Sequence, residues 1–98
     1  MPYIKPSNRK RYDKLVDKLA LMIAGEYRGN IKAGDINYIV TRFMLGILRS
    51  NGTNYNNLNA AVGVVECVKQ ELYRMQAAPY EDKKKEENGS VFYPKWTH

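Results

Sequence analysis

The chain has little of the chemistry on which most enzymes depend. Its 98 residues include one cysteine, Cys67, and one histidine, His98, which is the last residue. Nucleophile–base pairs and metal clusters usually need several such side chains close together. Two glutamates of the longest apolar segment, Glu66 and Glu71, are five residues apart and therefore about 140° apart around a helix. We therefore expect that the protein is not an enzyme and that it has no cofactor and no metal site.

Long apolar runs are also missing. No stretch approaches the roughly 20 apolar residues that a membrane-spanning helix needs, and no signal peptide opens the chain. A single cysteine cannot form an internal disulfide, which suits a reducing compartment. We expect a cytoplasmic protein that has no membrane partner.

Positive charge exceeds negative charge, and the excess is greatest at the start of the chain. The net charge is +6, and residues 1–18 hold six basic and two acidic side chains. Such a cluster attracts nucleic acid or phosphates, although charged residues also cover ordinary solvated helix faces. Nucleic acid is therefore a possible partner.

The longest predicted helix covers residues 54–78. Its apolar residues recur at steps of three and four, which is typical of a helix that packs along its length. A second apolar stripe lies beside the first, so the apolar surface is wider than one partner element needs. This second stripe predicts an oligomer interface at Ala60, Gly63, Val64 and Cys67.

The remaining patterns predict an all-α fold, a small three-helix bundle with a short fourth helix and extended N- and C-terminal arms. Ser7 and Asp35 are the expected N-caps of the first two helices, and Pro79 is expected to end the third. A single domain of 98 residues is expected, comprising an arm at 1–7, main helices at 8–27, 36–50 and 54–78, a short helix at 79–88 and a tail at 89–98.

The apolar stripes also predict a core. We expect it to contain the residues that face inward on the three main helices, namely Leu15, Leu19, Ile39, Phe43, Val65, Val68 and Leu72.

Basic and aromatic residues share one face of the second helix. Tyr38, Arg42 and Arg49 occur there at helical spacing, where a ring can stack on a base and a guanidinium can hold phosphate. An exposed, solvated helix face has the same composition. The other candidate ligand-binding residues are Arg28 and Lys32 in the preceding loop and Tyr3 and Lys5 in the N-terminal arm.

Several segments resemble a family of short proteins encoded in phage genomes and phage-like regions of bacteria. The resemblance rests on MPYIKP at the start, LNAAVGVVECVKQELYR in the long helix, APYEDKKKEENG after it, and VFY near the end. Ser90 stands where the family pattern has an acidic residue, which argues against a cation site there. The resemblance implies a viral setting within an infected bacterium and assigns no reaction.

These observations predict a phage-type binding protein that acts as a homo-oligomer. Its partner would be an anionic, nucleotide-like signalling ligand or a host defence protein, which it would sequester or neutralise. The chain has eight tyrosines and nine asparagines, and these side chains stack on bases and read their edges. The alternatives are a basic accessory protein that binds DNA or RNA, a protein–protein inhibitor and a structural phage component.

Overall fold

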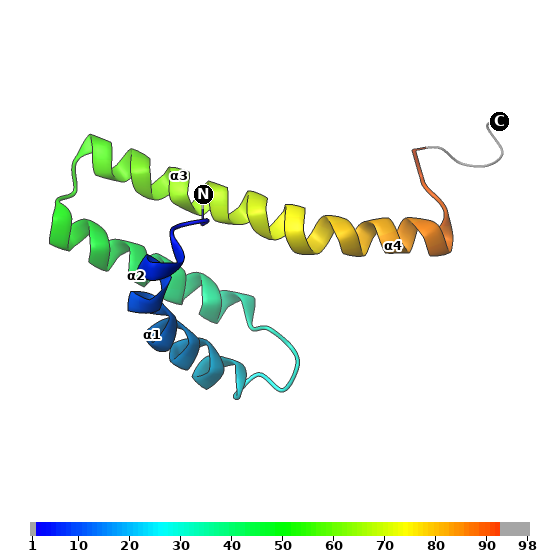
Figure 1. Cartoon of the computed structure of the whole chain (residues 1–98), viewed down its shortest axis with the longest axis horizontal. Coiled ribbons are helices and arrows are strands. Elements are labelled where there is room, and N and C mark those ends of the chain that lie inside the picture. Colours follow the sequence, from blue (N-terminus) through cyan, green and yellow to red (C-terminus); the bar gives the residue numbers. More distant parts are fainter. Residues whose placement is uncertain (1, 93–98) are drawn as a thin grey trace. The chain divides into compact units, whose positions relative to one another are not determined.

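The computed structural model describes residues 2–92, and within that range it contains helices and no strand (Figure 1). The helices are α1 (Pro6–Ala24), α2 (Ala33–Asn51), α3 (Tyr55–Leu72) and α4 (Ala78–Asn88), with a π-helical turn, η1 (Tyr73–Ala77), between the last two. The predicted all-α fold, with three main helices, a short fourth and terminal arms, is confirmed. The part of the predicted tail at 93–98 lies outside the described residues.

Close contacts divide the chain into two units. The first, residues 2–61, contains α1, α2 and the first two turns of α3. The second begins at Val62 and contains the rest of α3, η1 and α4.

The first two helices begin earlier than their predicted caps. Pro6 is the first residue of α1, where its missing N–H costs nothing and its fixed φ suits a helix. Ser7 therefore lies inside the helix, and its prediction as the N-cap is wrong. Asp35 is likewise not a cap, because Lys32 precedes α2 and Asp35 lies in its first turn. There the carboxylate still stabilises the positive end of the helix.

Asparagine side chains fix the turn between α2 and α3. Asn54 Oδ1 accepts the backbone N–H of Asn57 at 2.9 Å, so Asn54 caps α3. The Asn57 side-chain amide donates to the backbone oxygen of Gly52 at 2.9 Å. Gly52 has φ +111°, a conformation that other residues rarely adopt. These contacts reverse the chain, and the first two turns of α3, which belong to the same unit, run antiparallel to α2 (Figure 1).

Pro79 was expected to end the third helix, but the chain stays helical on both sides of it. It occupies the start of α4, and the preceding turn widens to a π-helix in which the Ala78 N–H donates to the Tyr73 carbonyl. A wider turn accommodates the ring and the missing N–H of proline with less disruption than a regular α-turn would. The helical path therefore continues through η1 from Tyr55 to Asn88.

The predicted core is wrong, because neither unit encloses one. Leu48 is the only buried hydrophobic residue among those described. The side chain of Leu15 is 73% exposed and that of Phe43 is 62% exposed. Ile39 is half-buried, and the other predicted core residues that are also exposed are Leu19, Val65, Val68 and Leu72. The stripes exist as predicted, but contacts among the described residues leave them only partly covered.

Candidate ligand-binding site

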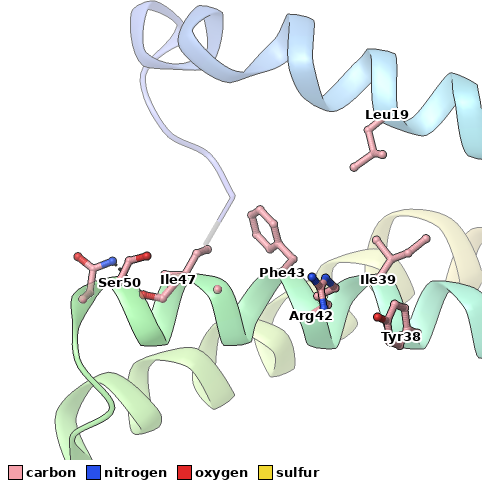
Figure 2. A pocket seen from close by; sticks show the side chains of 9 residues that line it. Leu19, Tyr38, Ile39, Arg42, Phe43, Ile47 and Ser50 are labelled. Carbon is pink, nitrogen blue, oxygen red and sulfur yellow. Dashed lines mark hydrogen bonds between the residues drawn. The ribbon is translucent and has the colours of Figure 1, made fainter.

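An open hollow of about 630 Å³ lies between α1 and α2. We call it the α1–α2 hollow. Leu19 points into it from α1, and Ile39 and Phe43 point toward α1 from α2 (Figure 2). The complete lining is Leu19, Tyr38, Ile39, Arg42, Phe43, Gly46, Ile47, Ser50 and Asn51. The hollow therefore has an apolar floor and polar groups at its edge.

Tyr38 and Arg42 form one edge of this hollow. They are four residues apart on α2 and so lie one turn apart on the same side of the helix. The Tyr38 side chain is 62% exposed, and Arg42 forms no ion pair or hydrogen bond within the described residues. An accessible ring beside an unpaired guanidinium can stack on a planar group and hold an anion.

Tyr38 also borders a second, shallower hollow of about 530 Å³ at the start of α2. Asn37 and Thr41 line that hollow, and the Thr41 hydroxyl donates to Asn37 Oδ1 at 3.4 Å. The Tyr38 ring therefore stands between the apolar α1–α2 hollow and a second hollow that has polar groups in a mostly apolar lining. A ligand with an aromatic part and a polar part could contact both surfaces.

The other predicted binding residues of the first unit do not line the α1–α2 hollow. Arg49 lies in the last turn of α2, and Arg28 lies in the loop after α1 with a left-handed φ of 48°. The Lys32 ammonium lies 5.9 Å from the centre of the Tyr27 ring, a cation–π distance. Partial burial of the Tyr27 hydroxyl, followed by the charges of Asp35 and Glu26, raises the pKa of Tyr27.

The N-terminal arm is attached to its own helix. Arg9 Nε donates to the carbonyl of Ile4 at 2.8 Å, which holds the arm against the first turn of α1. Lys5 is the residue before this helix, and Tyr3 is 52% exposed. Neither Tyr3 nor Lys5 lines the α1–α2 hollow.

Sequence reasoning missed the floor of this hollow. Leu19 and Phe43 were expected in a closed core, and no binding role was predicted for Ser50 or Asn51. The periodicity did place Ile39 and Phe43 on the inward side of α2. It could not show that this side stays open, because an apolar stripe does not identify the surface that covers it.

The α1 helix carries its positive charge on exposed side chains. Arg11 lies 5.6 Å from the centre of its neighbour's ring, that of Tyr12. Within the described residues, ion pairs occur between positions 66 and 87 and none involves α1. The lysines of α1 are therefore available to a polyanion.

A further hollow, of about 510 Å³, lies in the second unit beside α4. The Tyr73 hydroxyl donates to Glu81 Oε2 at 3.2 Å across η1, and this hydrogen bond is the main cause of a raised Tyr73 pKa. Ser90 Oγ accepts the backbone N–H of Phe92 at 3.1 Å. No group of three or more His, Cys, Asp or Glu residues within positions 2–92 could hold a metal ion. His98 lies outside the described residues.

The four predicted interface residues share one side of α3. Ala60, Gly63, Val64 and Cys67 are all exposed. A Cβ atom added to Gly63 would meet nothing within 4 Å. This side of the helix is therefore open to another surface.

A protein-family model described as "Domain of unknown function (DUF6899)" matches residues 1–91. Comparison with curated proteins and with solved structures gives no match. Among the described residues, no helix has the length and apolar character needed to cross a membrane.

Proposed function

Because the chain belongs to the family of the domain of unknown function DUF6899, we propose its function from its own residues. We propose a non-enzymatic protein that binds a nucleotide-like anion and acts as a homo-oligomer. The observation that carries this proposal is the Tyr38–Arg42 edge of the α1–α2 hollow.

This edge offers the two contacts that a nucleotide requires. The Tyr38 ring can stack on a base, and the planar fork of Arg42 can hold a phosphate through two parallel hydrogen bonds. The apolar floor beside them supports the flat face of a base or ribose. Ser50 and Asn51, at the far end of the hollow, add polar groups that can bind a second phosphate or a base edge.

The biological setting that we propose is phage infection of a bacterium. It rests on the resemblance of the two ends and the long helix to short phage proteins. A small protein without nucleophile–base or metal clusters can act there by sequestering a nucleotide signal of the host's defence. The site of action would be the host cytoplasm.

Isothermal titration calorimetry tests the ligand. The probes are a panel of cyclic mono- and dinucleotides and cyclic ADP-ribose isomers, titrated into the full chain. We expect heat of binding with at least one of them and at least tenfold weaker binding after Arg42→Gln. No heat with any probe would overturn the small-ligand proposal.

Arg49→Gln is the matched control, because Arg49 is on the same helix and does not line the hollow. The two substitutions remove the same charge and have similar helix propensity. We expect the Arg49 variant to bind as the parent does. Equal losses in both variants would indicate a general effect of net charge, and an unaffected Arg42 variant would show that the site is wrong.

A second candidate is nucleic-acid binding through α1, favoured by its exposed lysines that make no ion pair within the described residues. The affinity for a DNA or RNA duplex would then fall steeply with salt concentration. Lys10→Gln, Lys14→Gln and Lys18→Gln together would reduce that slope. Passage through heparin at low salt would count against this candidate.

A further inference from the structure

Ala60, Gly63, Val64 and Cys67 are exposed on one side of α3, which we call the outer face of α3. A helix turns 100° per residue, so these four residues fall within an arc of about 100°. The Val64 side chain is 52% exposed, and no residue of α3 is buried. An isolated helix of this length is marginal in water, so α3 needs a packing surface.

The exposed area is larger than two compact units would leave. The chain exposes 9278 Å². Two separately folded units of about 7 and 4 kDa would expose roughly 6,900 Å² between them. The difference, roughly 2,400 Å², exceeds the roughly 800 Å² that each partner contributes to a stable interface.

The outer face of α3 lacks the charges that would keep two copies of this basic chain apart. The chain carries +6, so two copies repel each other wherever their basic surfaces meet. From Ser50 to Val65 no Lys, Arg, Asp or Glu occurs, and the cation nearest along α3, Lys69, is paired with Glu66 at 3.2 Å. The outer face is therefore a neutral apolar surface along which like-charged copies can meet.

We propose that two copies of the chain associate through the outer face of α3, in a twofold contact that brings Val64 close to Val64 of the second copy. A twofold interface uses the same surface on both subunits, which suits an uncharged face. Gly63 and Ala60 then let the two backbones approach closely. The inference rests on the oligomeric part of the proposed function and is independent of the ligand.

Cysteine substitutions at two valines provide the test. Val64→Cys and Val62→Cys are each made together with Cys67→Ser, so that each chain carries one cysteine. Val62 is 70% exposed and lies about 200° from Val64 around the helix. We expect mild oxidation to give a disulfide-linked dimer from the Val64 variant and little from the Val62 variant. Equal cross-linking, or cross-linking of the Val62 variant alone, would overturn the proposed face.

Light scattering of the full chain separates this inference from the proposed function. We expect at least twice 11.3 kDa for the parent and for Val62→Arg, and at least tenfold weaker association for Val64→Arg. A monomeric parent would overturn both the interface and the oligomeric part of the function. An oligomer that binds no nucleotide would overturn the ligand proposal alone, and an oligomer insensitive to Val64→Arg would overturn the interface alone.

Discussion

Asn54 and Asn57 show how two side chains can determine a chain reversal. Asn54 caps α3, and Asn57 donates to the carbonyls of the residues that end α2. The backbone groups at this turn would otherwise have only water as a partner. The direction in which α3 leaves α2 therefore depends on polar contacts as well as on apolar packing.

Asn54→Ala should lower the free energy of unfolding by about 1 kcal/mol, because alanine cannot accept the N–H of Asn57. Urea denaturation followed by circular dichroism measures the change. Asn59→Ala is the control, since Asn59 is exposed on the same helix and makes no side-chain hydrogen bond within the described residues. Equal losses in the two variants would contradict the capping role.

The Tyr73–Glu81 hydrogen bond should respond to high pH. Glu81 raises the pKa of Tyr73 above its ordinary value of 10.0, because the carboxylate accepts from the neutral hydroxyl and repels the phenolate. The neutral form is thus favoured in the fold. The contribution to stability is complete below pH 10.0 and is lost as the pH rises through the folded-state pKa.

Ultraviolet titration of tyrosinate checks this expectation. Tyr73→Phe should remove a component that ionises above the ordinary range, and Glu81→Gln should lower the pKa of that component, since glutamine cannot repel the phenolate. A Glu81→Gln titration identical to that of the parent would show that Tyr73 is not held by Glu81.

At the residue scale the sequence could predict neighbours on one helix and little else. The four-residue spacing of Tyr38 and Arg42 was enough to place them together, and the structure puts both at one hollow. Arg28 and Lys32 could not be placed in this way. Their positions depend on loop dihedrals, including the left-handed φ of Arg28, for which the sequence has no periodic signal.

At the scale of elements, apolar periodicity identified the helices but not how they begin or join. Two of the errors involve proline. Pro6 starts α1 where a serine was expected to cap it. Pro79 was expected to end the third helix, but the π-helical turn before it keeps the helical path continuous into α4. Each outcome depends on which backbone N–H groups lack partners, and residue preferences alone do not determine that.

Pro79→Ala should raise the free energy of unfolding by up to about 3 kcal/mol and increase helical ellipticity. Alanine restores the N–H that proline lacks, so η1 can convert to a regular α-turn. Thermal unfolding monitored by circular dichroism measures both effects.

Pro6→Ala is the control for this substitution, since proline is well tolerated at the first position of α1. We expect it to leave stability unchanged or slightly reduced. A loss of stability in the Pro79 variant would mean that the π-turn is favoured by contacts other than those of proline.

For the whole molecule, the patterns could predict which side of each helix is apolar but not which surface covers that side. Val65 and Val68 belong to a regular stripe and are nevertheless exposed. The pattern is the same whether the covering surface belongs to the same chain or to another. One sequence could therefore establish which segments are helices and which side of each is apolar. It could not establish which of those sides are buried.

Stability should depend on protein concentration if a second copy covers the outer face of α3. A tenfold increase in concentration stabilises a dimer by about 1.4 kcal/mol relative to unfolded monomers. Thermal midpoints measured over a hundredfold range should rise steadily. A midpoint independent of concentration would indicate that each chain covers its own apolar surface.

The absence of a core within the described part of each unit also bears on the lifetime of the protein in a cell. A newly made chain would present Val64 and Cys67 of the outer face of α3 to proteases until it met a second copy. Degradation would compete with pairing, and pairing would accelerate with the square of the number of chains. A small rise in the rate of synthesis would then produce a disproportionate rise in the amount that survives, so that abundance would behave as a threshold.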